Sequence, residues 1–155
     1  MKVWWDKKCL LSGQDWEEGF VSGLVGAAYF VTILSRDGMK NESEKLPNFE
    51  RLTVDSKIDN VLLEWRLAME LKERDMLLGV FPVMVGDILP DETYSNYLKS
   101  HCAPTNAPEV VVQKVELKVR EHLDREGLGS PYSENETVKS VVEFILRNNG
   151  GFIFG

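Results

Sequence analysis

The stretch Tyr-Phe-Val-Thr-Ile-Leu at residues 29–34 decides how the rest of the chain is interpreted. It is a run of β-branched and aromatic residues that is apolar on both faces, which is typical of a buried strand in a parallel sheet. A second such run, Leu-Leu-Gly-Val-Phe-Pro-Val-Met-Val, covers residues 77–85. Because Pro82 has no N–H to donate, we expect part of this strand to lie at an edge or a bulge. A shorter β-rich run at residues 2–5 begins almost at the first residue.

Helices are predicted between these strands because apolar residues recur there at intervals of three and four. Asp15 is a favourable N-cap for a helix whose apolar positions run from Phe20 to Val25. Asp59 caps the strongest helix of the chain, which extends to about Arg74. Helices in these places suit the crossover connections that parallel strands need.

The C-terminal part of the chain is predicted to add two more helices. Residues 109–125 carry valine at every fourth position over most of their length, and the capping box Ser133-x-x-Glu136 precedes a further amphipathic stretch. Residues 39–58 are expected to form a long loop with a short helical turn, and residues 152–154 a short apolar tail.

This order of elements favours an α/β fold with an open parallel sheet flanked by helices. Three strands make a small sheet and the chain begins directly on one of them, so we expect an initial strand and helix to be missing upstream. The strand at residues 2–5 is expected to pair with residues 29–34 or to lie at an open edge. The residues expected to be buried in the sheet are Trp5, Phe30, Ile33, Leu34, Val80, Phe81 and Val83.

The composition is that of an acidic globular protein. Hydrophobic residues are 43% of the 155 and charged residues 28%, which excludes a chain disordered throughout. Eighteen Lys and Arg against 25 Asp and Glu give a net charge of −7, which argues against binding to nucleic acid. No apolar run approaches the roughly 20 residues of a membrane-spanning helix. Two cysteines, Cys9 and Cys102, favour a reducing compartment. We therefore expect a single cytoplasmic domain over residues 1–155.

One carboxylate of the helix that follows Asp59 lies inside its apolar stripe. At about 100° per residue, Glu64 falls between Ala68 and Leu71. An unpaired charge is costly to bury, so Glu64 either belongs to a functional cleft, lies at the edge of the stripe, or caps a neighbouring loop. Ligands of parallel sheets bind beyond the C-terminal ends of the strands, and the start of this helix is expected there. The charged residues Arg66, Glu70, Glu73 and Arg74 cluster on the other side of the helix.

The residues able to ligate a metal do not suggest a metal site. Cys9, Cys102, His101 and His122 lack the spacing of zinc ligands, and we expect no metal. His122 continues the valine face of its helix and is expected to be a partly buried helix residue.

The order of these segments resembles that of TIR (Toll/interleukin-1 receptor) domains. Residues 3–34, with Asp6, the loop through Gly13 and an acidic helix start, resemble the second strand, BB loop, second helix and third strand of the family. The pattern Asp59-x-Val61-x-x-Glu64 resembles the third helix, and residues 80–85 resemble the fourth strand.

The similarity covers about residues 2–87 and is strongest to the NAD-hydrolysing branch of the family. Residues 88–155 add a loop and helices without a site-by-site match. The resemblance implies a flavodoxin-like fold, here without its first strand and helix, and assembly through contacts between TIR domains. It also implies a role in signal transduction, with innate immunity as the expected setting.

The resemblance implies that Glu64 is catalytic and that NAD⁺ is a substrate, hydrolysed at the nicotinamide–ribose bond, with no bound cofactor. The substrate-binding residues it implies are Asp6, Gly13, Trp16, Ser35 and Asn60. Other TIR domains, including further copies of this chain, are the expected protein partners.

Two other interpretations remain open. The first is a TIR scaffold without enzymatic activity, which recruits other TIR domains. The second is a flavodoxin-like response-regulator module, in which Asp6 would be the phosphoacceptor at the end of a strand. An exposed apolar loop over residues 7–16 is expected to promote self-association in the TIR interpretations.

Overall fold

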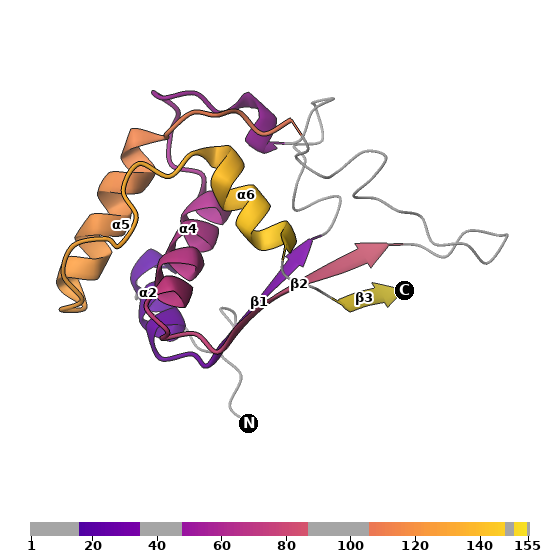
Figure 1. The fold of residues 1–155 in the computed structure, drawn as a ribbon, viewed down its shortest axis with the longest axis horizontal. Helices are drawn as coiled ribbons and strands as arrows, with labels where there is room; N and C mark the ends of the chain where they lie inside the picture. The colour runs from indigo at the N-terminus through magenta and orange to yellow at the C-terminus, as the bar shows by residue number, and fades with distance from the viewer. Residues whose placement is uncertain (1–15, 35–47, 87–105, 148–150, 155) are drawn as a thin grey trace, which may run out of the picture.

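The computed structural model describes residues 16–34, 48–86, 106–147 and 151–154. In chain order the elements are α2 (Trp16–Val25), β1 (Tyr29–Leu34), the 3-10 helix η1 (Asn48–Arg51), α4 (Asn60–Glu73), β2 (Gly79–Gly86), α5 (Gln113–Arg125), α6 (Val138–Arg147) and β3 (Gly151–Phe154). From α2 to α6, helices and strands therefore follow one another as the sequence predicts (Figure 1).

The three strands form one parallel sheet in the order β1-β2-β3. This confirms the mixed α/β class and the parallel pairing. Residues 152–154, expected to form only a tail, belong to β3, so the sequence interpretation missed this strand. The predicted strand at residues 2–5 lies outside the described residues.

Pro82 lies in the middle strand but at a place where it pairs on one side. It is opposite Thr32 of β1, whereas β3 starts one residue later, with Gly151 opposite Val83. The missing N–H of Pro82 is therefore tolerated where β3 has not yet begun. The prediction that part of this strand lies at an edge is confirmed in this sense.

The two faces of the sheet differ in exposure. Phe30 and Leu34 of β1 and Val80 of β2 are buried, as predicted. The predicted burial of Ile33 and Phe81 is wrong because alternate strand residues point to opposite faces and the described helices cover only one face.

Val83, also predicted to be buried, is only partly buried. Trp5 lies outside the described residues.

Gly79 allows an aromatic pair to form across β1 and β2. A Cβ atom at this position would lie 2.9 Å from the ring of Phe81 and 3.3 Å from the ring of Tyr29. The two rings therefore lie together where Gly79 has no side chain, with centroids 5.7 Å apart. Cross-strand aromatic contact of this kind compensates for a glycine in a strand.

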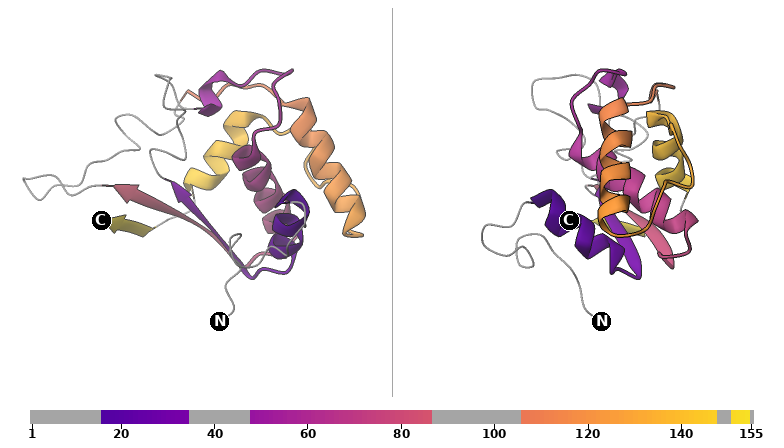
Figure 2. Two further views of the ribbon diagram at one scale, coloured as in Figure 1. Left: turned by 180° about the vertical axis from the view of Figure 1, so that it is seen from behind. Right: turned by 90° about the vertical axis from the view of Figure 1, so that its left-hand side faces the viewer.

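Helix α4 is the centre of the structure. It contacts α2, α5, α6 and β2, and the two views of Figure 2 show it surrounded by other elements. The Trp65 indole Nε1 donates a 2.9 Å hydrogen bond to Oγ1 of Thr32 beneath the sheet. The ring of Phe49 in η1 packs edge-on against Trp65, at 5.0 Å between centroids, and both side chains are buried.

Hydrogen bonds of nearby residues determine where α4 and α5 begin. Asp59 is confirmed as the N-cap of α4, since its Oδ1 accepts the Leu62 N–H at 2.9 Å. Helix α5 begins at Gln113, four residues later than the predicted start at residue 109. The carbonyls of Pro108 and Val110 instead accept backbone N–H groups at the start of α6.

The predicted capping box of α6 is wrong. Asn135 adopts a positive φ of 62°, which interrupts a helix between Ser133 and Thr137. Thr137 then caps the helix, because its Oγ1 accepts the Ser140 N–H at 3.1 Å. The Ser133 hydroxyl donates instead to Glu73.

We expect the bond between Trp65 and Thr32 to stabilise the helix–sheet contact. Thr32→Val keeps the shape but leaves the indole N–H buried without an acceptor, which should cost about 1–3 kcal/mol of unfolding free energy. In a Trp65→Phe background the same change should cost almost nothing, because no donor remains. Urea unfolding of the four proteins measures the coupling, and additive effects would contradict the prediction.

Candidate functional site

The N-terminal end of α4 points toward the C-terminal ends of the strands. Its other end lies near the strand starts, because the Leu78 N–H donates to the Ala28 carbonyl at 2.7 Å, just before β1. Nζ of Lys72, in the last turn of α4, lies 3.2 Å from the carbonyls of Leu77 and Leu78. Helix α4 therefore runs antiparallel to the sheet (Figure 1). Its first turns lie at the edge where parallel sheets bind ligands.

Asn60 and Glu64 come together at this end of α4. They are four residues apart, so they are neighbours on one face of the helix. Asn60 is exposed and Glu64 is partly buried. Most of the helix that follows is fully buried, so Glu64 is the last partly exposed carboxylate before the helix enters the core.

Asp59 supports this end of the helix. Burial raises the pKa of its carboxyl above the ordinary range, although hydrogen bonds from the Leu62 and Val61 backbone act in the opposite direction. Because Oδ1 is used by the Leu62 N–H, Asp59 holds the first turn in place. It thereby fixes the position of Asn60 directly after it.

The structure brings together only two of the six predicted site residues. Asp6, Gly13 and Ser35 lie outside the described residues. Trp16 is the first residue of α2, and Glu17, the next residue, contacts α5. The contacts described for α2 are with α4 and, through Glu17 and Glu18, with α5.

The charged cluster on the other side of α4 is buried, which the sequence did not predict. Arg66 and Glu70 are fully buried, and Arg66 pairs with Glu70 at 3.2 Å and with Glu116 of α5 at 2.8 Å. Arg74 pairs with Glu70 at 2.7 Å. The i, i+4 spacing of Arg66, Glu70 and Arg74 was visible in the sequence, but the residues that cover them come from elsewhere in the chain.

The cluster also holds the loop between α5 and α6. The Tyr132 N–H donates to Glu70 at 2.7 Å, and Arg74 donates to the Leu128 carbonyl at 2.8 Å. Arg66 donates to the Ser133 carbonyl, and the Arg74 guanidinium stacks over the Tyr132 ring at 4.5 Å. Every one of these contacts satisfies a backbone or side-chain group, so we assign the cluster a structural role.

The two carboxylates of the cluster differ in acidity. Burial acts to raise the pKa of Glu70, but hydrogen bonds from the Tyr132 N–H, Arg74 and Arg66 outweigh it, and the pKa lies below the ordinary range. For Glu116 burial dominates over its contact with Arg66, and the pKa is raised. Glu70 is therefore the firmly ionised partner that the two arginines share.

A second polar contact lies between α2 and α5. Nε2 of His122 is 2.7 Å from Oε1 of Glu17, and Nζ of Lys118 is 3.2 Å from the same oxygen. His122 is almost fully buried, more than the partial burial predicted, and its Nδ1 has no hydrogen-bond partner among the described residues.

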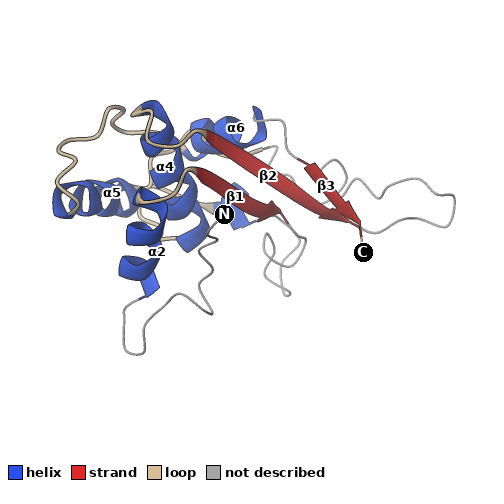
Figure 3. Ribbon diagram, turned by 90° about the horizontal axis from the view of Figure 1, so that it is seen from below, coloured by secondary structure: helices blue, strands red, loops and turns tan. Residues whose placement is uncertain are grey.

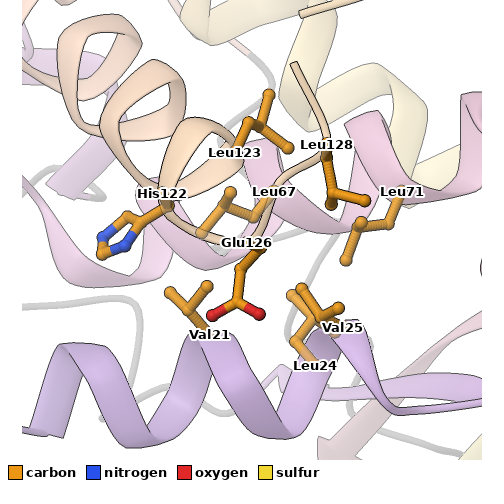
Figure 4. Close-up of a pocket in the computed structure, with 9 residues that line it drawn as sticks. All are labelled: Val21, Leu24, Val25, Leu67, Leu71, His122, Leu123, Glu126 and Leu128. Atoms are coloured by element: carbon orange, nitrogen blue, oxygen red, sulfur yellow. The ribbon is translucent and has the colours of Figure 1, made fainter. Parts of the chain in front are cut away.

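His122 also borders a narrow gap between α2, α4 and α5 (Figure 4). Figure 4 shows apolar side chains of all three helices around it and the Glu126 carboxylate directed toward α2. The gap admits no water-sized sphere, so it does not compete with the first turns of α4 as a ligand site.

Comparisons with known proteins identify no relative. No family model, no curated protein and no solved structure matches this chain. Over the described residues, no helix has the length and apolar character needed to cross a membrane, and no group of three or more His, Cys, Asp or Glu side chains is placed to hold a metal ion.

We expect the buried cluster to depend on Glu70. Glu70→Gln keeps the shape of the side chain but removes the counter-charge that the buried Arg66 and the partly buried Arg74 share. It should lower the unfolding free energy by about 3 kcal/mol. Glu73→Gln, an exposed change on the same helix, should stay within about 0.5 kcal/mol of the wild type. Equal effects in chemical unfolding at neutral pH would contradict the prediction.

The same carboxylate should make stability depend on acidic pH. Since the pKa of Glu70 is lower in the folded protein than its ordinary value of 4.5, its stabilising contribution is present above pH 4.5 and is lost as pH falls through the folded-state pKa. Glu70→Gln should therefore lose less unfolding free energy than the wild type between pH 4.5 and more acidic values. An equal loss of unfolding free energy in the two proteins as the pH falls would refute this.

Proposed function

We propose that this chain is a TIR-like domain that cleaves the nicotinamide–ribose bond of NAD⁺, with Glu64 as the catalytic carboxylate. The observation that supports the proposal most is the position of Glu64. It is partly buried, one turn inside α4, beside the exposed Asn60, at the end of the helix that faces the C-terminal edge of a parallel sheet. The resemblance of the pattern Asp59-x-Val61-x-x-Glu64 to the third helix of NAD-hydrolysing TIR domains supports it independently.

The chemistry suits a carboxylate in this place. Cleavage breaks the C–N bond between ribose and nicotinamide, so positive charge develops on the ribose as nicotinamide leaves, and water then adds to the ribose carbon to give ADP-ribose. An ionised Glu64 would stabilise that charge or hold the ribose hydroxyls. The positive end of the α4 dipole favours the pyrophosphate of the substrate at the same edge. Asn60 would contact the sugar from the first helical position.

Asp6, Gly13, Trp16 and Ser35 complete the proposed substrate site, together with Asn60. Other TIR domains, including copies of this chain, are the proposed partners, with residues 7–16 as the contact. We place this activity in cytoplasmic signalling of the innate-immune type. NAD⁺ acts as substrate, without a bound cofactor.

A second candidate function is a TIR scaffold without catalysis. It is favoured by the apolar residues that β1 and β2 leave exposed, since exposed apolar patches mark sites of protein association. In that case Glu64 would simply lie at the edge of the apolar stripe of α4, without a catalytic role.

The deciding experiment measures nicotinamide release from NAD⁺. Glu64→Gln keeps size and hydrogen bonding but removes the charge, so it should reduce release by about two orders of magnitude or more. Glu73→Gln is the matched control, being an exposed glutamate near the other end of α4, and should release nicotinamide at the wild-type rate. Circular dichroism should show equal folding for all three proteins.

The other outcomes separate the candidates. Equal release by the wild type and Glu64→Gln would remove Glu64 from the mechanism. Release by neither protein, with folding intact, would favour the scaffold.

A further inference from the structure

One lysine lies directly before α4, at the end of the helix where the substrate site is proposed. Lys57 is exposed and precedes the N-cap Asp59 by two residues and Asn60 by three. Figure 3 shows the three parallel strands pointing toward one edge of the sheet. Because α4 begins at that edge, Lys57 brings a positive charge to the end of the helix that carries Asn60 and Glu64.

The backbone that leads to Lys57 is fixed by hydrogen bonds. The Thr53 N–H donates to Oγ of Ser56 at 2.8 Å, and the Ser56 N–H donates to the Thr53 carbonyl at 3.1 Å. Nζ of Lys114 in α5 donates to the Asp55 carbonyl at 3.3 Å. The fold therefore sets the point from which the flexible Lys57 side chain extends.

Lys57 differs from the other basic residues of the described part of the chain in having no partner there. Within residues 16–34, 48–86, 106–147 and 151–154, the charged group of every other lysine or arginine interacts with another group of the protein. These residues are Arg51, Arg66, Lys72, Arg74, Lys114, Lys118, Arg120, Arg125, Lys139 and Arg147. The ammonium of Lys57 is therefore available to a ligand, at the edge where one is proposed.

The proposed substrate needs such a charge. NAD⁺ carries a pyrophosphate, whereas Asp59 and Glu64 are acidic and the whole chain has a net charge of −7. The Asp59 side chain accepts the Leu62 N–H, which leaves fewer N–H groups of the first turn for an anion. The helix dipole alone contributes only about 0.3–1 kcal/mol to a nearby charge. A lysine ammonium is a common partner of phosphate groups.

We propose that Lys57 binds the pyrophosphate of NAD⁺ and thereby selects dinucleotides over nicotinamide riboside, which has no phosphate. This rests on the proposed function, because it concerns the same substrate at the same edge of the sheet. Glu64 and Asn60 contact the ribose next to nicotinamide, and Lys57 contacts the phosphates. Since the pyrophosphate takes no part in the bond that breaks, Lys57 contributes to affinity and specificity.

The first test compares NAD⁺ and nicotinamide riboside as substrates. Lys57→Gln should raise KM for NAD⁺ about tenfold, the scale of one hydrogen bond to a charged group. Its kcat should stay nearly unchanged, because a contact that is equal in the ground state and the transition state affects binding alone. KM for nicotinamide riboside should not change. Lys57→Arg should restore KM for NAD⁺, because it keeps the charge.

The matched control is Lys139→Gln. Lys139 also lies in the first turn of a helix, α6, but it is paired with Glu109 and is away from the proposed site. This variant should have the KM of the wild type for both substrates. Circular dichroism should show equal folding for all variants, since each changed side chain is at least partly exposed.

The second test does not depend on catalysis. ADP-ribose keeps the pyrophosphate and lacks nicotinamide, so its binding can be measured by isothermal titration calorimetry whether or not the chain cleaves NAD⁺. Its Kd should be about tenfold higher for Lys57→Gln than for the wild type, again the scale of one charged hydrogen bond. The Kd for Lys139→Gln should equal that of the wild type.

The results separate this proposal from the proposed function. Binding of ADP-ribose that depends on Lys57, without nicotinamide release from NAD⁺, would keep Lys57 as a phosphate contact and remove the hydrolase activity. Nicotinamide release with the same KM in the wild type and Lys57→Gln would keep the hydrolase and overturn the role of Lys57. Equal Kd values for ADP-ribose in these two proteins, or no binding by the folded wild type, would also overturn it.

Discussion

The Glu70 carboxylate, fully buried on α4, is the constraint on which the rest of the structure depends. It accepts hydrogen bonds from Arg66, Arg74 and the Tyr132 N–H, and its charge balances the buried guanidinium of Arg66 and the partly buried guanidinium of Arg74. The buried charged side chains of this helix must pair with other groups of the protein, because an unpaired buried charge costs several kcal/mol. The loop between α5 and α6 is consequently fixed to α4 through its backbone.

Enclosure of α4 also determines where function can reside. Once its polar side is used by the ionic cluster and its apolar side by Trp65 and the sheet, accessible residues remain only in its first turns and near its C-terminal end at Glu73. Asn60 and Glu64 occupy those turns, at the edge of the sheet that parallel α/β proteins use for ligands. The ionic cluster and the proposed site thus lie on one helix with separate roles.

The two faces of the sheet also differ in what they contact. Its buried face meets α4 through Thr32 and the apolar residues around it, while its other face places Tyr29 and Phe81 where a partner can reach them. The proposed catalytic site at the start of α4 and the exposed apolar residues of β1 and β2 lie on different surfaces. A single chain can therefore support both proposed functions, or either one alone.

The sequence by itself determined the elements whose signals are local. The strand at residues 29–34, the cap at Asp59 and the helix after it follow from side-chain periodicity and from the hydrogen-bonding capacity of one aspartate, so they were predicted with their approximate bounds. The place of Glu64 within an apolar stripe is likewise a property of helical spacing. These features need no knowledge of what packs against them.

Only the tertiary structure decided which surfaces are covered. An apolar strand looks the same in sequence whether helices cover one face or two, and so Ile33 and Phe81 were expected to be buried although they are exposed. Arg66 and Glu70 look like a solvated pair until Glu116 and the Tyr132 loop, about 50 and 60 residues away in the chain, close over them. Helix α6 is capped by Thr137 and not by Ser133, because Asn135 between them has a left-handed backbone conformation. Burial and pairing depend on contacts between distant segments, and local sequence does not encode those contacts.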